Sequence, residues 1–199
     1  GSFFAVIIYF YKDIANFFEN KIIFFKIIIS SVPVMIVGFL LTQYDIINKI
    51  DALLINESFS FKESLYQICK ILKSNISYFD WVGFYFADHK NKELILESYI
   101  GDKTDHNKIP FGKGICGQVA ISNKNFMVPN VKDEKNYISC NINVKSELVV
   151  PIFLNGKNIG QIDVDSNTLN PFNQNDVKLL ELVSRAVSKK MKKNKIILY

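Results

Sequence analysis

The most informative segment of the chain reads Phe111-Gly-Lys-Gly-Ile-Cys-Gly-Gln118 and continues through Met127-Val-Pro-Asn-Val131 to Tyr137-Ile-Ser-Cys140. Two of the three cysteines of the chain, Cys116 and Cys140, lie in this segment. A functional interpretation of the sequence depends on these two thiols and on the acidic residues that follow them, which are Glu147, Asp163 and Asp165.

Two glycines, in Gly112-Lys-Gly114, lie directly before the apolar run Ile115–Ile121, which has the length of a helix of about two turns. Backbone N–H groups at a helix N-terminus attract anions and lower the pKa of a nearby thiol, so Cys116 is a candidate thiolate. The glycine spacing does not match the dinucleotide or P-loop fingerprint. The polar segment Lys132–Val144, which contains Cys140, is typical of a functional loop.

The composition limits the class of protein. With 199 residues the chain has room for one domain and an appendage, and three cysteines without a cleavable signal peptide indicate reduced thiols in the cytoplasm. The net charge of +5 is mild, and no zinc-ligand spacing, aromatic interleaving or helix-turn-helix pattern accompanies it. We therefore expect no bound metal or cofactor and no nucleic-acid partner.

The positive charge is concentrated in a basic run near the C-terminus. A solvated helix end is the favoured interpretation of this run, and a membrane surface is the alternative. Residues 193–199 are expected to form a basic tail. The run contains Arg185, Lys189, Lys190, Lys192, Lys193 and Lys195.

Residues 1–50 differ in composition from the remainder of the chain, and because the chain begins with Gly1 rather than Met we expect it to be a fragment. Of the two apolar runs, Phe3–Tyr11 and Ile22–Leu41, the second has the length of about 20 residues that a helix needs to cross a bilayer. A buried helix of a soluble protein is the alternative. The favoured prediction is a hydrophobic helical membrane segment over residues 1–50 and a junction at 51–56, which would tether a cytoplasmic domain to the inner membrane.

Within this region, residues 1–13 and Ile27–Leu41 resemble an internal piece of the undecaprenyl-diphosphate phosphatase family of integral membrane enzymes. The catalytic glutamates, histidine and Ser-Arg motif of that family lie outside the piece, and the chain has no counterpart of them further on. We therefore expect no phosphatase activity. A fusion, a gene-prediction accident or a chimeric assembly would each explain the junction.

Helical patterns occur at both ends of the region after residue 56. Asn56–Ile76 has the apolar periodicity of an amphipathic helix and begins with a capping box between Ser60 and Glu63. Cys69 falls on its apolar stripe, which indicates a buried structural thiol. The segment after Pro171 leads into a final amphipathic helix that continues to about Lys193.

Strand patterns lie between these helices. Trp81–Ala87 and Leu94–Ile100 are expected to pair as one hairpin, and Ser146–Leu154 and Lys157–Ser166 as another around the two-residue turn Asn155-Gly156. The order of elements predicts an α+β fold, in which an antiparallel sheet carries the terminal helices on one face and the crossover loops on the other.

The strand period of two places several site candidates on common faces. Trp81 and Tyr85 share one face of their strand, as either core residues or the wall of a ligand pocket. Gln161, Asp163 and Asp165 share one face of theirs, as either a solvent-facing surface or a polar pocket wall.

Taken together, six motifs in this order resemble the GAF domain over residues 57–192, and specifically its free methionine-R-sulfoxide reductase branch. The motifs are Trp81-Val-Gly-Phe-Tyr85, Ile109-Pro-Phe-Gly-Lys-Gly-Ile-Cys-Gly117, Val128-Pro-Asn-Val131, Cys140, Ser146-Glu-Leu-Val-Val-Pro151 and Ile159-Gly-Gln-Ile-Asp-Val-Asp-Ser166.

The resemblance implies a role for each candidate residue. Cys140 corresponds to the nucleophile that attacks the sulfoxide sulfur, and Cys116 to a resolving thiol that forms a disulfide with it. The acidic residues are implied to hold the substrate ammonium and assist proton transfer, and the aromatic residues to wall the pocket. The resemblance further implies an external dithiol reductant such as thioredoxin, and it is compatible with a homodimer. The implied substrate-binding residues are Trp81, Tyr85, Glu147, Asp163 and Asp165.

The chain departs from the pattern of that family at two places. His106 stands where the family commonly has another cysteine, and Tyr137-Ile-Ser-Cys-Asn141 stands where the family reads His-Ile-Ala-Cys-Asp. A second hypothesis therefore remains open beside the reductase, namely a GAF sensor module that binds a small amino-acid-like ligand without turnover.

Overall fold

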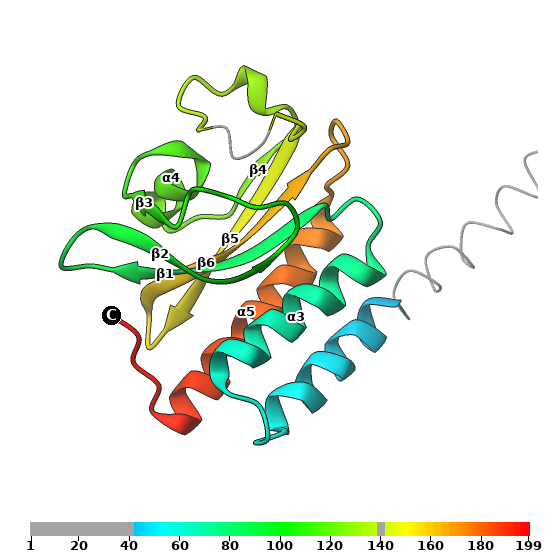
Figure 1. The fold of residues 1–199 in the computed structure, drawn as a ribbon, viewed down its shortest axis with the longest axis vertical. Helices are drawn as coiled ribbons and strands as arrows, with labels where there is room; N and C mark the ends of the chain where they lie inside the picture. The colour runs from blue at the N-terminus through cyan, green and yellow to red at the C-terminus, as the bar shows by residue number, and fades with distance from the viewer. Residues whose placement is uncertain (1–41, 139–141) are drawn as a thin grey trace, which may run out of the picture. The chain divides into compact units, whose positions relative to one another are not determined.

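The structure is a computed structural model that describes residues 42–138 and 142–199 (Figure 1). Most of the predicted membrane segment, including both apolar runs, falls outside these residues, so the phosphatase resemblance stays a prediction. Among the helices of the described ranges, none has the length and apolar character needed to cross a bilayer. The elements are, in order, α3 (Phe61–Asn75), β1 (Trp81–Asp88), β2 (Glu93–Ile100), β3 (Lys108–Pro110), α4 (Gly114–Ser122), β4 (Phe126–Val128), the 3-10 turn η1 (Val131–Asp133), β5 (Ser146–Leu154), β6 (Lys157–Ser166) and α5 (Gln174–Asn194).

The strands form one six-stranded antiparallel sheet with the order β3-β2-β1-β6-β5-β4. Both predicted hairpins are present, and β1 pairs with β6, so strands far apart in sequence lie side by side at the centre. Asn155 and Gly156 both have positive φ, of 51° and 81°, as a two-residue hairpin turn of type I′ requires. β3 was not predicted, because a three-residue edge strand carries no period that a sequence pattern can reveal.

The two faces of the sheet carry different cores. α3 and α5 cover one face, as Figure 1 shows, and the buried residues there form what we call the helix-side core. α4 and the segments around it cover the other face, where the buried residues form the site-side core. The predicted α+β arrangement is confirmed. The helix-side core includes Leu65, Ile68, Leu72, Val82, Phe84, Leu148, Val164, Leu180 and Val183, and the site-side core includes Trp81, Tyr85, Ile115, Cys116, Val119 and Val149.

A helix covers residues 42–55, immediately after the part of the chain that is not described. Ile46, Ile50 and Leu54 are buried in the helix-side core, four residues apart, so they lie on one face of this helix. The compact unit accordingly begins at Asp45, whereas the sequence placed residues 45–56 in the hydrophobic segment and the junction. A boundary drawn from composition concealed this helix, because placing it at residue 50 divides the stripe of Ile46, Ile50 and Leu54.

Replacing Ile50 by alanine is expected to lower the free energy of unfolding by about 2 to 5 kcal/mol, because the side chain is 0% exposed and its loss leaves a cavity. Ile55 lies on the same helix but is 73% exposed, so Ile55→Ala is the matched control and should change stability by less than about 0.5 kcal/mol. Denaturant unfolding of both variants measures the difference. Equal effects would show that this helix is not part of the domain.

The helix ends differ in detail from the prediction. At α3 the Ser60 hydroxyl accepts the Glu63 N–H at 3.1 Å, but the Glu63 carboxylate accepts from Gln67 Nε2 at 2.7 Å, so only half of the predicted capping box forms. A full capping box lies instead at the start of α5, between Asn173 and Asp176. The Ser60 hydroxyl is sufficient to satisfy one of the unpaired donors of the first turn.

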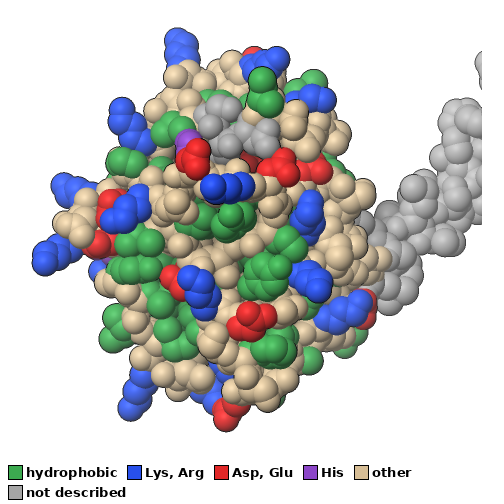
Figure 2. Space-filling view, viewed as in Figure 1, with side chains coloured by type: hydrophobic (Ala, Val, Ile, Leu, Met, Phe, Trp, Pro, Cys, Tyr) green, Lys and Arg blue, Asp and Glu red, His purple; other side chains and the backbone are tan. Residues whose placement is uncertain are grey.

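The basic run ends in a segment that is partly packed rather than wholly solvated. Ile196 and Leu198 pack against the helix-side core, and the Tyr199 hydroxyl donates to Glu97 Oε2 at 3.1 Å. On the face drawn in Figure 2, the described Lys and Arg side chains are interspersed with Asp and Glu. This mixture gives that face no strong field of one sign.

Candidate active site

β1 and β6 bring the predicted aromatic and acidic residues together. Trp81 is the register partner of Asp165, Gly83 that of Asp163, and Tyr85 that of Gln161. Side chains of directly opposed residues emerge on the same face, so all of them point to the site-side core. On the other side of β6, Glu147 of β5 is opposite Asp165.

Trp81 has a tightly defined position on this face. Its indole stacks on the Tyr99 ring, with centroids 5.3 Å apart and an interplanar angle of 20°, and lies 6.3 Å from the Tyr85 ring. It also covers Gly83, where an added Cβ would come within 2.2 Å of the indole, so only glycine leaves room for it. The Tyr85 hydroxyl donates to the His106 carbonyl oxygen at 2.9 Å, which fixes the second ring.

The three acidic residues are buried, with exposed fractions of 4% for Glu147 and 2% for both Asp163 and Asp165. Of the two interpretations left open by the sequence, the solvent-facing surface is therefore excluded. One oxygen of each aspartate, Oδ1, has no hydrogen-bond partner among the described residues. Burying an unpaired carboxyl oxygen is costly, which favours a polar wall that a bound group would complete.

Burial and mutual repulsion hold protons on this acidic wall. The pKa of Glu147 is well above its usual value because of burial and then the charges of Asp163 and Asp165. Burial also raises the pKa of Asp165, with Asp163 and Asp80 adding to the effect. The pKa of Asp163 is raised to about 7 by burial, against hydrogen bonds from Cys116 and Glu147 that favour its ionised form. The wall therefore retains protons near neutral pH.

The wall should make the stability of the protein depend on pH. Because the folded-state pKa of Asp163 is raised from 3.8 to about 7, its contribution is fully present below pH 4 and is lost as the pH rises towards 7. The free energy of unfolding should fall over that range by on the order of a few kcal/mol, and Asp163→Asn should flatten the profile. Urea unfolding at a series of pH values measures this. Parallel profiles for Asp163→Asn and the exposed control Asp105→Asn would contradict it.

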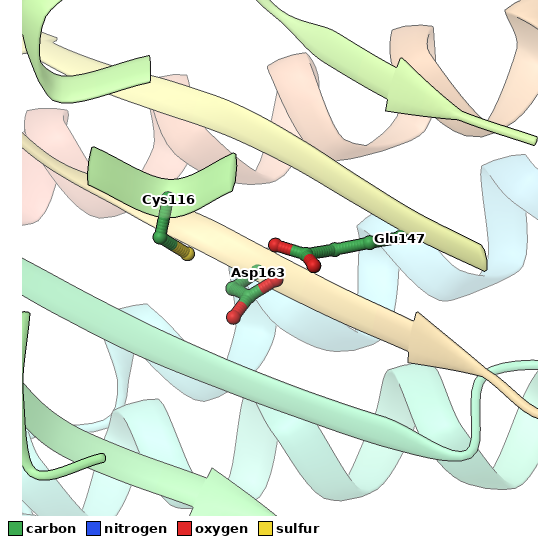
Figure 3. A group of neighbouring side chains, drawn as sticks. All are labelled: Cys116, Glu147 and Asp163. Carbon is green, nitrogen blue, oxygen red and sulfur yellow. The ribbon is translucent and has the colours of Figure 1, made fainter. Parts of the chain in front are cut away.

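The glycines before α4 place the predicted thiol beside the acidic wall. Gly112 and Gly114 have φ values of 83° and 63°, which glycine adopts readily, and they turn the chain into the helix as predicted. Cys116 lies in the first turn of α4 and is buried. Its Sγ and one carboxylate oxygen each of Glu147 and Asp163 all lie within 4.8 Å of one another. Figure 3 shows the three side chains converging from α4, β5 and β6.

The remaining cysteines and the residues around Cys140 are not among these three side chains. Cys140, the predicted nucleophile, and Asn141 lie outside the described residues. Asn136, which precedes them in the sequence, donates from Nδ2 to the carbonyl oxygen of Gly112, just before α4, at 2.7 Å. Tyr137 packs against the site-side core. Cys69 is fully buried in the helix-side core, where burial raises its thiol pKa, as expected of a structural cysteine.

Two cavities border the wall. The larger, of about 380 Å³, has Trp81 and Asp165 in its lining, together with the strand-connecting residues Gly101–Thr104. The smaller, of about 10 Å³, is lined by Cys116, Glu147, Asp163 and His106, among others. Of the site candidates that the structure describes, Trp81 and Asp165 thus line the larger cavity, and Cys116, Glu147 and Asp163 line the smaller one. Tyr85 is packed in the site-side core.

Comparison with models of known protein families identifies the fold. The model of the GAF domain family matches residues 60–189, which is most of the chain. The chain belongs to the GAF domain family.

Relatives of this GAF domain include proteins with a named activity. It is 36% identical to GAF domain-containing protein A of Dictyostelium discoideum, over 69% of this chain and 85% of the relative. It is 33% identical to free methionine-R-sulfoxide reductase of Saccharomyces cerevisiae, over 55% of this chain and 62% of the relative. The solved structure of free methionine-R-sulfoxide reductase from Neisseria meningitidis, in complex with its substrate, superposes with a TM-score of 0.72 at 29% identity, over 77% of this chain and 92% of that chain.

Two residues of the GAF domain site, Tyr99 and Gln161, were not among the substrate-binding residues that the sequence implied. Tyr99 stacks on Trp81, but its place follows only from the β1–β2 register, which pairs it with Gly83. Gln161 is completely buried beside Asp163, and neither its amide nitrogen nor its amide oxygen has a partner in the described part of the chain. The strand period of two placed Gln161 on the acidic face, but the sequence did not show that this residue is buried.

Proposed function

We propose that this GAF domain reduces free L-methionine-(R)-sulfoxide to methionine. The observation that carries the proposal is the convergence of a cysteine thiol with two buried carboxyl groups that retain protons, next to a cavity walled by Trp81. Similarity to named reductases of yeast and Neisseria supports it. The reaction needs a thiol that takes up oxygen and an acid that protonates that oxygen. The buried carboxyl groups supply the acid, and Cys140 is the proposed thiol.

In the first step, the thiolate of Cys140 attacks the sulfoxide sulfur. The buried acidic wall donates the proton that the departing oxygen requires. Glu147 is the proposed donor, because burial and the charges of Asp163 and Asp165 raise its pKa well above its usual value and its carboxyl group lies beside the Cys116 thiol. Methionine leaves with its sulfur reduced, and Cys140 keeps the oxygen as a sulfenic acid.

The next steps return the enzyme to its reduced form. The Cys116 thiol attacks the sulfenic sulfur, a disulfide forms between the two cysteines, and the oxygen leaves as water. A thioredoxin-like dithiol then reduces the disulfide and is itself oxidised. Among the described residues, Cys116 is the thiol on the correct face of the sheet, because Cys69 lies in the helix-side core.

The larger cavity suits the amino-acid part of the substrate. Its volume of about 380 Å³ falls in the range of small-molecule sites, and it combines an aromatic wall with the buried carboxyl group of Asp165. An ammonium group paired with Asp165 would satisfy the oxygen that has no partner. The Trp81 indole supplies an apolar and π-rich surface for the sulfur-bound methyl group.

A stereochemical assay tests the proposed activity. Residues 45–199 and the full chain are given the R and S sulfoxides of free methionine with a thioredoxin system, and reductant consumption is followed. Consumption with the R sulfoxide alone is the expected result. Equal rates with both sulfoxides, or an unchanged rate in Cys140→Ser, would refute the proposal.

A sensor module is the second candidate, and His106 is the observation that favours it. His106 lines the small cavity at the position where the reductase family commonly has a cysteine. A sensor would bind methionine sulfoxide or a similar ligand and quench Trp81 fluorescence in Cys140→Ser, while the unmodified protein would consume no reductant. Binding without turnover therefore selects the sensor over the enzyme.

A further inference from the structure

We propose that Cys116, Glu147 and Asp163 form a binding site for a divalent cation of borderline softness, best matched by zinc. The three ligand atoms lie within 4.8 Å of one another, and the residues come from α4, β5 and β6, three elements that the sheet and its covering helix hold in place. Figure 3 shows their side chains directed towards one common point. No spacing rule in the sequence could reveal this site, because its members are 31 and 16 positions apart along the chain.

The donor set selects the metal. One thiolate sulfur with two carboxylate oxygens matches zinc, whereas magnesium and calcium take oxygen ligands alone. Three protein ligands leave a fourth tetrahedral position for water or another donor. Independently of the thiol, Asp163 Oδ1 is buried without a hydrogen-bond partner in the described residues, so the site still lacks a positive or hydrogen-bonding group.

His106 is the candidate for a fourth metal ligand. It lines the same small cavity as the three ligands and is half-buried, unlike them. Neutral imidazole is among the commonest zinc ligands, so His106 is the candidate for the fourth position. Where another cysteine is common in the reductase family, this chain therefore carries a residue that can also bind zinc.

Metal binding is coupled to proton release. The cation replaces the proton of the Cys116 thiol, because the thiolate is the form that binds a metal, and this proton goes to solvent. Affinity should consequently fall as the pH is lowered. Zinc also occupies the sulfur that would otherwise attack the sulfenic acid, so it should block turnover reversibly. This last consequence rests on the proposed reductase function, whereas binding itself does not.

Cobalt(II) titration of the reduced full chain tests the site, since a thiolate–cobalt bond gives a charge-transfer band in the near ultraviolet. We expect one equivalent of cobalt to bind, zinc to displace it, and the band to disappear in Cys116→Ser. The matched control Cys69→Ser should keep the band. Glu147→Gln and Asp163→Asn should each weaken binding roughly 10-fold or more, and His106→Ala should weaken it less.

Two outcomes would overturn the proposal. One is a band that survives in Cys116→Ser and disappears in Cys140→Ser, which would place the metal on the other thiol. The other is cobalt binding that Glu147→Gln and Asp163→Asn leave unchanged, which needs no folded Cys116→Ser protein to be decisive. A protein that binds cobalt but reduces no sulfoxide would support the metal site and refute the proposed function, so the two failures are distinguishable.

Discussion

Cys116→Ser is expected to allow one round of sulfoxide reduction and to stop the rounds that follow. Cys140 can still take the oxygen, so about one equivalent of methionine should appear per protein molecule. The sulfenic acid then has no neighbouring thiol, and its resolution depends on a reductant from solution. Because the intramolecular reaction has a much higher effective concentration of thiol, steady-state turnover should fall by more than about 100-fold.

The measurement combines a methionine burst with chemical trapping. Quenched-flow assay of Cys116→Ser should give a burst of one equivalent, and a sulfenic-acid reagent such as dimedone should then label Cys140. Cys69→Ser is the matched control, because its thiol is fully buried on the opposite face of the sheet and should not affect either rate. Wild-type turnover in Cys116→Ser would mean that resolution uses a different thiol.

Local patterns predicted those parts of the fold that depend on local chemistry. The Asn155-Gly156 turn fixed the β5–β6 hairpin to the residue, because both positions must adopt positive φ. The strand period of two correctly placed Trp81 and Tyr85 together on one face of β1, and Asp163 and Asp165 together on one face of β6. These predictions succeeded because the information lies within a few residues of each position.

Features that depend on distant contacts were not accessible in the same way. The β1–β6 pairing, which places Trp81 opposite Asp165, joins strands separated by more than half of the domain. The acidic face of β6 lines a pocket because α4 covers it. The sequence did not show this, because two charged residues on one strand face are compatible with a solvent-exposed surface and with a polar pocket wall. The helix over residues 42–55 was missed for a different reason. Ile46, Ile50 and Leu54 recur every four residues, but the boundary drawn at residue 50 divided this stripe, and its burial in the helix-side core shows that it belongs to the domain.

Glu147→Gln is expected to lower kcat for the R sulfoxide by about 100- to 10,000-fold, the range associated with loss of a general acid. The amide has nearly the same shape as the carboxyl group and stays buried, so the fold and the larger cavity should be retained. The departing oxygen, however, loses the proton that the raised pKa of Glu147 keeps available. Single-turnover methionine release measures this step without the contribution of the reductant.

The pH profile separates acid catalysis from a merely structural effect. Wild-type activity should decline on the alkaline side as the wall loses its protons, and the Asp163 pKa of about 7 places part of that decline near neutrality. Glu147→Gln should lose most of this alkaline decline along with its rate. Asp165→Asn provides the contrast, because loss of the ammonium partner should raise KM more than it lowers kcat. If both variants changed only KM, the acidic wall would bind the substrate without donating a proton, and the oxygen would have to take its proton from water or from the second thiol.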